Sequence, residues 1–193
     1  MKTLNVGMIG AGFMGKAHSL SFAAMPMFFW PAPAIPVRKM VADVTEEAAA
    51  EAAKRLGFEL YTADWREVVE HPDIDVIDIV TPNNSHAEIA IAAAKAGKHI
   101  ICEKPLARDA AEAKAMLDAV EAAGVKHMVA FNYRRTPAVA LAKNISKKAR
   151  SAKFSISAAR ICKTGPPIRI RRCPGASRKR SPAPARLATS ARM

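Results

Sequence analysis

Polar and charged side chains follow three apolar runs that are typical of buried β-strands. Thr-Pro-Asn-Asn-Ser-His occupies residues 81–86, Glu-Lys-Pro occupies 103–105, and Asn-Tyr-Arg-Arg occupies 132–135. The carboxyl ends of parallel strands meet at one edge of a sheet, where open α/β sheets bind their ligands. We therefore expect these segments to surround a cofactor and a small substrate, where a lysine can polarise or deprotonate a substrate hydroxyl.

Each of these segments also has a simpler interpretation when it is taken alone. Asn84 or Ser85 suits a helix N-cap, and His86 suits a surface position in the first helical turn. Glu103 and Lys104 suit a solvated ion pair, and the two arginines of the last segment suit a solvated surface. Only their occurrence together favours a functional site.

A glycine-rich motif, G-x-G-x-x-G, lies directly after the first apolar run and directly before a helical run. Its glycines are Gly10, Gly12 and Gly15, with Phe13 and Met14 between the last two. In a dinucleotide-binding turn the first glycine permits the tight turn, the second admits the pyrophosphate, and the third lets the helix pack on the sheet. The helix N-terminus adds unpaired N–H groups and a partial positive charge. The alternative is a glycine-rich turn that binds nothing.

An acidic residue, Asp43, ends the second predicted strand. A carboxylate at this place accepts hydrogen bonds from ribose hydroxyls and repels a 2′-phosphate, so NAD is favoured over NADP. Asp43 follows the glycines by more than the usual spacing of about 20 residues, and a proline-rich insertion at residues 25–36 accounts for the excess. The alternative role for Asp43 is a helix N-cap.

The elements that position these groups alternate between short β-rich runs and amphipathic runs. The predicted strands are residues 4–9, 37–42, 58–61, 76–80, 98–102 and 127–131. The predicted helices are residues 13–24, 46–56, 64–69, 85–96 and 107–123, the second of them capped by Thr45. Residues 25–36 contain four prolines and are predicted to be a loop. We therefore expect an α/β fold, a doubly wound parallel Rossmann sheet over residues 1–143.

Charge divides the chain at Lys143. All 17 acidic residues and 16 of the 30 basic ones lie at or before it, whereas residues 144–193 hold 14 basic residues and no acid. The cysteines, Cys102, Cys162 and Cys173, lack the spacing of zinc ligands, so we expect neither a metal site nor a disulfide framework. No signal peptide is recognisable and no apolar run reaches about 18 residues, which favours a cytoplasmic protein without a membrane partner.

Taken together, the motifs resemble the glucose-fructose oxidoreductase and inositol dehydrogenase family (Gfo/Idh/MocA) over residues 1–143. The matching words are G-x-G-x-x-G-x-x-H at residues 10–18, T-P-N-x-x-H at 81–86, E-K-P at 103–105 and N-Y-R at 132–134. The resemblance implies that Lys104 is a catalytic and substrate-binding residue, often placed before a cis-proline. Residues that it places near the cofactor are Thr81, Pro82, Asn83, His86, Glu103 and Lys104, and residues that it places near the substrate are Lys104, Asn132, Tyr133 and Arg134.

The resemblance also implies a reaction. A member of this family transfers a hydride between a secondary alcohol of a sugar or polyol and NAD(P), while a base takes the hydroxyl proton. Intact relatives are expected to be homo-oligomers. In the family, further acid–base residues come from a G-D-x-x-x-H motif in a second, substrate-binding domain, and this motif is missing from the sequence.

Residues 144–193 have no lasting hydrophobic period. Most amino acids fix the first two bases of their codon, and Leu, Arg and Ser allow two choices, so this segment can be reread one base out of frame. Over Ser181–Met193 the rereading permits A-G-S-G-A-L-G-D-I-G-A-H; from Lys143 it permits K-Y-I-E-E-G-K, and from Ser151 it permits G-K-I-F-H-F-R-G. Similar sequence segments follow N-Y-R-x-x-P-A in the family. We therefore predict that a frameshift near residues 143–144 replaced the substrate domain by a disordered basic tail.

Two other functions fit parts of the sequence. A non-catalytic dinucleotide-binding module needs only the glycine turn and Asp43. A nucleic-acid binder would use the basic tail, but out-of-frame GC-rich codons give arginine, proline and serine without selection for binding, so no specific nucleic-acid partner is expected.

Overall fold

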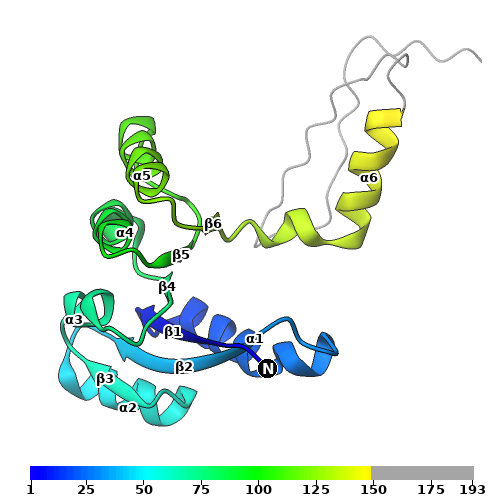
Figure 1. The fold of residues 1–193 in the computed structure, drawn as a ribbon. Coiled ribbons are helices and arrows are strands. Elements are labelled where there is room, and N and C mark those ends of the chain that lie inside the picture. Colours follow the sequence, from blue (N-terminus) through cyan, green and yellow to red (C-terminus); the bar gives the residue numbers. More distant parts are fainter. Residues whose placement is uncertain (149–193) are drawn as a thin grey trace, which may run out of the picture. The chain divides into compact units, whose positions relative to one another are not determined.

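The computed structural model describes residues 1–148, in which a parallel six-stranded sheet carries helices on its faces (Figure 1). The strands are β1 (Thr3–Ile9), β2 (Ile35–Ala42), β3 (Leu60–Thr62), β4 (Val76–Ile79), β5 (His99–Cys102) and β6 (His127–Val129). The helices are α1 (Phe13–Phe28), α2 (Glu46–Leu56), α3 (Trp65–Glu70), η1 (Asn83–Ser85), α4 (His86–Lys95), α5 (Ala110–Ala123), η2 (Asn132–Arg135) and α6 (Pro137–Lys148). The strand order β3-β2-β1-β4-β5-β6 is that of a dinucleotide-binding sheet, so the predicted Rossmann fold is confirmed.

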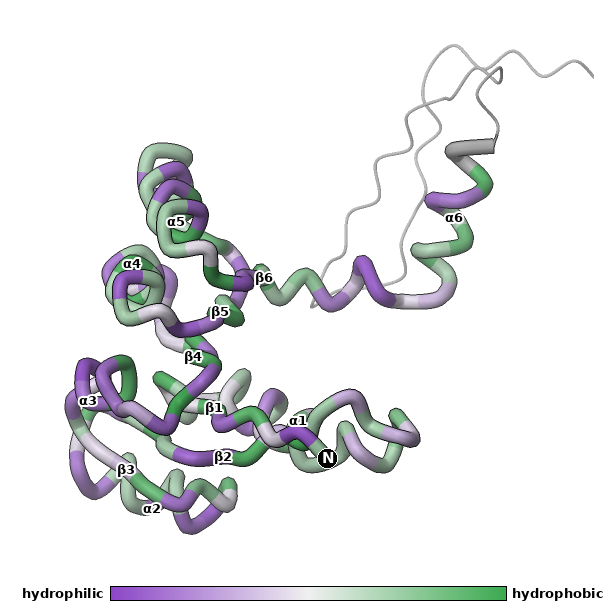
Figure 2. Tube along the Cα trace, viewed as in Figure 1, coloured by the Kyte–Doolittle hydropathy of each residue, from purple (hydrophilic) through white to green (hydrophobic). Residues whose placement is uncertain are grey.

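The two faces of the sheet bury different apolar clusters, because successive strand residues point to opposite faces. Ile9 of β1 belongs to the larger cluster, with the buried sides of α3, α4 and α5. Its neighbour Met8 belongs to the smaller cluster, together with Val41 of β2 and residues of α2. In Figure 2, hydrophobic and hydrophilic residues alternate around α5, as expected for a helix with one face on the core.

Side-chain caps fix where three of the helices begin. Thr45 Oγ1 accepts the Ala48 N–H at 3.2 Å and starts α2, which confirms the predicted cap. Asp64 caps α3 in the same way. Asp109 Oδ1 accepts the Glu112 N–H at 2.9 Å, so α5 begins at Ala110, three residues later than predicted.

The prediction that residues 25–36 form a loop is wrong at both ends of that segment. Helix α1 continues to Phe28 with Pro26 in its last turn, because a proline there removes only one helical N–H and the Phe29 N–H still reaches the Met25 carbonyl at 3.1 Å. Strand β2 already begins at Ile35 and includes Pro36. Because β3 pairs only with residues 40–42 of β2, no strand needs the N–H that this proline lacks.

Other boundaries differ by a few residues. Strand β3 lies two residues later than predicted at its start, β6 ends at Val129, and a short η1 turn precedes α4. The predicted domain boundary at Lys143 falls inside α6. Residues 149–193 lie outside the described part of the chain, so the disordered tail and its frameshift origin stay predictions. No helix among residues 1–148 is both long and apolar enough to span a membrane.

Candidate functional site

A groove of about 780 Å³ lies at the carboxyl ends of β1, β2 and β4. Seven of the predicted site residues line it: Gly10, Gly12, Phe13, Met14, Asp43, Thr81 and Pro82. Asn84, Ser85 and Trp65 line it as well, although they were not among the predicted site residues. The groove therefore brings the glycine turn, the acid of β2 and the turn after β4 to one place, as the strand ends predicted.

The three glycines occupy positions where a side chain would have different consequences. Gly10 has a φ of +95°, and a Cβ there would lie 3.0 Å from the Val80 carbonyl oxygen. A Cβ on Gly15 would lie 2.6 Å from the Gly10 carbonyl oxygen, so α1 packs on the turn at a distance that only glycine allows. A Cβ on Gly12 would meet nothing within 4 Å, because this residue faces the open groove. The tight turn at Gly10 and the close helix packing at Gly15 agree with the predicted roles, and the approach of a pyrophosphate to Gly12 stays a prediction.

The N-terminus of α1 offers a site for an anion. The first helical bond joins the Lys16 N–H to the Gly12 carbonyl at 3.1 Å, so the N–H groups of Phe13, Met14 and Gly15 have no acceptor within the helix. No side chain caps this end and no acidic residue lies in the first turn. A diphosphate in the groove would therefore meet free N–H donors and the positive end of the helix dipole.

Asp43 is tied to the glycine turn. Its Oδ2 accepts the Ala11 N–H at 3.1 Å and its Oδ1 accepts the Val44 N–H at 2.7 Å. The alternative role as the cap of α2 is wrong, because Thr45 holds that position. The half-buried carboxylate of Asp43 instead lines the groove, where it can accept hydrogen bonds from ribose hydroxyls.

The turn after β4 is fixed by its own hydroxyl groups. The Ser85 hydroxyl lies 2.7 Å from Thr81 Oγ1 and 2.9 Å from the Pro82 carbonyl. Asn83 begins η1, is half-buried and does not line the groove. His86 is 1% exposed, so the suggestion of a surface residue is wrong.

His86 lies between the turn after β4 and the turn after β5. Its Nδ1 lies 3.0 Å from the Pro105 carbonyl oxygen, and its Nε2 lies 2.9 Å from the Thr81 carbonyl oxygen. The imidazole lies between the segment after β4 and the segment after β5, and a ring N–H can donate to either of these backbone oxygens. Within the protein, its contacts are those of a buried support for the two turns.

The Glu-Lys-Pro segment follows β5 directly, and its members differ in exposure. Glu103 is buried, whereas the Lys104 side chain is 56% exposed. Glu103 Oε2 accepts the Lys104 backbone N–H at 3.0 Å and lies 3.7 Å from Lys104 Nζ. The Lys104–Pro105 peptide bond is cis, as the resemblance implied. The interpretation of Glu103 and Lys104 as a solvated ion pair is therefore wrong for Glu103, which is buried. Lys104 projects its amine toward solvent.

Two titratable residues next to this segment, His18 and Asp78, were not among the predicted site residues. His18 on α1 places Nδ1 3.0 Å from both carboxylate oxygens of Asp78, and Nε2 3.2 Å from Glu103 Oε1. Asp78, in the middle of β4, is fully buried. The pKa of His18 is raised, first by the hydrogen bond to Asp78, and burial raises the pKa of Asp78.

The predicted substrate residues lie beyond β6 on η2. Asn132, Tyr133 and Arg134 are exposed, and the Arg134 guanidinium lies 4.6 Å from the centre of the Phe131 ring. Asn132 and Arg134 line a second groove, of about 640 Å³, which also reaches His18. At this groove, the surface of β5 and β6 that faces the α1 side of the sheet is open to solvent.

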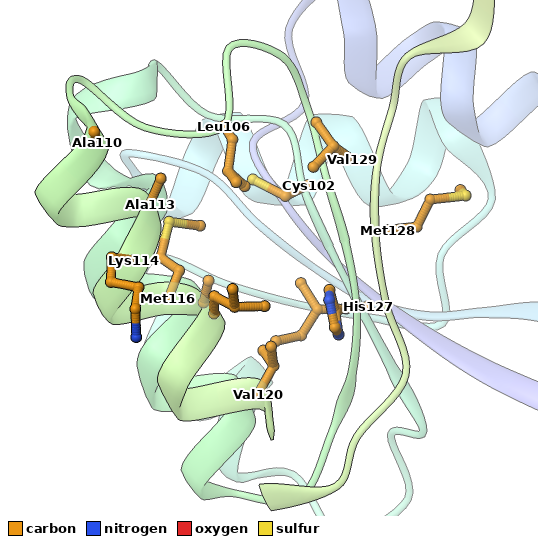
Figure 3. Close-up of a pocket in the computed structure, with 13 residues that line it drawn as sticks. Cys102, Leu106, Ala110, Ala113, Lys114, Met116, Val120, His127, Met128 and Val129 are labelled. Atoms are coloured by element: carbon orange, nitrogen blue, oxygen red, sulfur yellow. The ribbon is translucent and has the colours of Figure 1, made fainter. Parts of the chain in front are cut away.

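A third cavity, of about 440 Å³, lies between α5 and strands β5 and β6 on the other face (Figure 3). Figure 3 labels Met116 and Val120 on α5, and Cys102, His127 and Val129 on the strands, among the residues that line this cavity. Burial raises the pKa of the Cys102 thiol to about 12, so this thiol is not a nucleophile at neutral pH. The cavity lacks the glycine turn and the acid, so it is not the predicted cofactor site.

Comparison with known proteins agrees with the geometry. A sequence model described as an oxidoreductase family with an NAD-binding Rossmann fold, GFO_IDH_MocA, matches residues 4–131. The levoglucosan dehydrogenase of Pseudarthrobacter phenanthrenivorans is 71% identical over 143 residues, which are 74% of this chain and 37% of that protein. The myo-inositol 2-dehydrogenase of Thermotoga maritima is 31% identical over 131 residues, which are 68% of this chain and 37% of that protein.

Solved structures give the same result. A levoglucosan dehydrogenase in complex with NADH matches with a TM-score of 0.74 and 69% sequence identity, covering 76% of this chain and 40% of that one. The chain thus spans about two fifths of the length of these relatives. The groove fits an NAD cofactor, since an open glycine, free helix N–H groups and a carboxylate line it together. The chain belongs to the Gfo/Idh/MocA oxidoreductase family and contains its NAD-binding Rossmann domain.

Proposed function

We propose that this chain is the cofactor-binding part of an NAD-dependent dehydrogenase that acts on a secondary alcohol of a sugar or polyol. The observation that carries the proposal is the groove in which the glycine turn, the α1 N-terminus and Asp43 meet. The family and the activities named for its relatives, which act on levoglucosan and inositols, support the reaction class. The identity of 71% makes levoglucosan the first substrate to test.

Different residues of the chain would bind the cofactor and contact the substrate. Phe13, Met14 and Gly15 would bind the diphosphate through their N–H groups, and Asp43 would bind the adenosine ribose. Bound NAD supplies a nicotinamide that accepts the hydride. Lys104 would contact the substrate hydroxyl and hold or move its proton.

We propose that activity also needs residues that are encoded out of frame and therefore do not appear in the printed sequence. The length matched by the levoglucosan dehydrogenase, 143 residues, equals that of the predicted Rossmann domain and supports a change of frame near Lys143. The out-of-frame rereading contains G-D-I-G-A-H, the motif expected to provide further acid–base groups. We propose that the 193-residue chain binds NADH without turning over sugars.

Two measurements test this proposal. Fluorescence titration of the purified chain with NADH and NADPH should show binding that is tighter for NADH, since Asp43 disfavours a 2′-phosphate. A protein expressed from a gene with the frame restored should then oxidise levoglucosan or an inositol with NAD. Turnover by the 193-residue chain itself would contradict the proposed division of the enzyme, and absence of any NADH binding would contradict the proposed site.

The second candidate is a non-catalytic dinucleotide-binding module. The observation in its favour is that, within residues 1–148, every residue lining the cofactor groove lies before Lys143. Restored-frame protein that binds NADH but turns over none of levoglucosan, myo-inositol and scyllo-inositol would favour it.

A further inference from the structure

A half-buried histidine, His18, lies between two buried carboxylates next to the Lys104 turn, and the proposed function does not use it. His18 contacts Asp78 through Nδ1 and Glu103 through Nε2. Asp78 is 0% exposed and Glu103 is 5% exposed. Burying two carboxylates side by side is costly unless a cation or a shared proton lies between them.

We propose that His18 is a positioning residue for Lys104: held by Asp78, it orients the Glu103 carboxylate, which in turn holds the Lys104 backbone and faces the Lys104 amine. The catalytic part that this assigns to Lys104 rests on the proposed function. The positioning itself rests on the contacts among His18, Asp78, Glu103 and Lys104.

The number of protons in the cluster follows from its contacts. An ionised carboxylate only accepts hydrogen bonds, so each contact of the imidazole requires a proton. Either His18 carries protons on both nitrogens, or it shares one of them with Asp78. We assign the Nε2 proton to His18, so that His18 Nε2–H donates to Glu103 Oε1 while Oε2 accepts the Lys104 N–H.

This donor fixes the carboxylate at both of its oxygens. Oε1 is held at 3.2 Å by His18, and Oε2 is held at 3.0 Å by the Lys104 N–H. With both oxygens engaged, Oε2 remains 3.7 Å from Lys104 Nζ. Without His18, Oε1 would lose its only side-chain donor among the described residues, and the carboxylate would be free to rotate away from the turn.

A second imidazole supports the same turn from another element. His86 Nδ1 lies 3.0 Å from the carbonyl oxygen of Pro105, the residue after Lys104. The segment from Glu103 to Pro105 is therefore held by a side chain of α1 at one end and by a side chain of α4 at the other. This arrangement limits the positions that the base of the Lys104 side chain can take.

The charged and titratable groups around His18 come from several elements. Asp78 lies on β4, Cys102 lies at the end of β5, and Glu103 and Lys104 follow it; Arg134 and Arg135 of η2 line the groove that His18 also borders. The pKa of His18 is raised by Asp78 and then by Glu103, against the effect of burial. The imidazole is therefore expected to hold its second proton to a higher pH than a free histidine does.

The first test uses the unmodified 193-residue chain. In ¹⁵N NMR spectra of protein labelled at histidine, the His18 Nε2 signal should be that of a protonated nitrogen from pH 6 to pH 8. The signal is assigned by its absence from a His18→Phe variant or, if that variant does not fold, from His18→Gln. An unprotonated Nε2 at pH 7 would overturn the proposal, because no donor to Glu103 would then exist.

The second test separates positioning from simple support of the fold. In His18→Phe, which removes both ring donors, the Lys104 amide should exchange hydrogen about tenfold faster than in the wild type. In Asp78→Asn, a neutral His18 still donates Nε2–H to Glu103, so Lys104 exchange should stay within about twofold of the wild type even where stability falls. The amide of Ala130, bonded to the Cys102 carbonyl at 2.8 Å, serves as the internal control.

The outcomes distinguish this inference from the proposed function. Equal acceleration of Lys104 and Ala130 exchange in both variants would indicate a purely structural role and overturn the inference. If His18→Phe does not fold, the inference is decided by two other measurements: hydrogen exchange of the Lys104 amide in Asp78→Asn, and the His18 Nε2 signal of the wild type. Failure of the wild-type chain to bind NADH, with a protonated Nε2 and a protected Lys104 amide, would contradict the proposed function alone.

Discussion

The buried cluster around His18 should make the stability of the domain fall as pH rises above neutrality. In the folded chain the pKa of His18 is raised above its ordinary value of 6.5, whereas in the unfolded chain it returns to that value. Between these two values the folded state binds one more proton than the unfolded state. Stability is therefore fully present below pH 6.5 and is lost as pH rises toward the folded pKa.

The size of the loss follows from the proton count. One extra proton in the folded state gives a slope of about 1.4 kcal/mol per pH unit. Between pH 6.5 and pH 8.0 the loss amounts to at most about 1.6 kcal/mol, because the unfolded histidine is still half protonated at pH 6.5. Burial also raises the pKa of Asp78 from its ordinary value of 3.8, so the window in which Asp78 lowers stability starts at a lower pH than the window of His18.

The comparison that isolates this effect is Asp78→Asn. The substitution keeps the volume of the side chain but removes the hydrogen-bonding carboxylate that contributes most to the raised pKa of His18. Urea unfolding at pH 6.5, 7.25 and 8.0, followed by tryptophan fluorescence, should give a falling free energy of unfolding in the wild type. The slope in the variant should be much shallower. Parallel slopes in the two proteins would refute the assignment of a raised pKa to His18.

Four further predictions concern the cofactor groove, the core and the gene. Gly15→Val should lower the free energy of unfolding by about 2 kcal/mol and weaken NADH binding, since its Cβ would overlap the glycine turn; urea unfolding and NADH titration measure both, and unchanged values would disprove the close packing. Asp43→Ala should weaken NADH binding about tenfold, whereas Thr45→Ala, its matched control, should cost about 1 kcal/mol of stability and leave NADH affinity unchanged. Ile89→Ala should cost about 3 kcal/mol in urea unfolding, because this side chain is 1% exposed in the main core. DNA sequencing around the codon for Lys143 should reveal an inserted or missing base followed by a long open frame, and an intact frame would rule out the shift.

Much of the sheet could be predicted because four of the six described strands, β1, β3, β5 and β6, lie close to a glycine that marks a turn or a helix end. Gly10, Gly57, Gly97 and Gly124 all adopt positive φ, which the sequence indicated as turns and helix ends. Thr45 caps its helix as predicted. Element ends were less predictable where local signals compete, as at Pro26, which a helix tolerates in its last turn but which the sequence suggested as the start of a loop.

The cofactor groove was predictable because its residues lie at strand ends, whose meeting place the topology determines. The cluster beneath Lys104 was not predicted, although the sequence contained a signal for it. Asp78 interrupts the apolar run of β4, and a carboxylate in a buried strand requires a partner. Its partner is His18, 60 residues away on α1, and only the three-dimensional packing of α1 on the sheet identifies it. The roles of Lys104 and of the substrate residues stay predictions.

The sheet is not equally protected across its width. Strands β1 to β3 lie between helices of both faces, whereas β5 and β6 are covered by α4 and α5 on one face and border an open groove on the other. Met128 is consequently 49% exposed, and the three-residue β6 pairs only with β5. Local opening therefore costs less free energy in this half than around the glycine turn. The glycine turn, which is proposed to bind the diphosphate, can stay closed while the strand beside the Lys104 segment loosens, which would give the two ends of a bound dinucleotide different mobility.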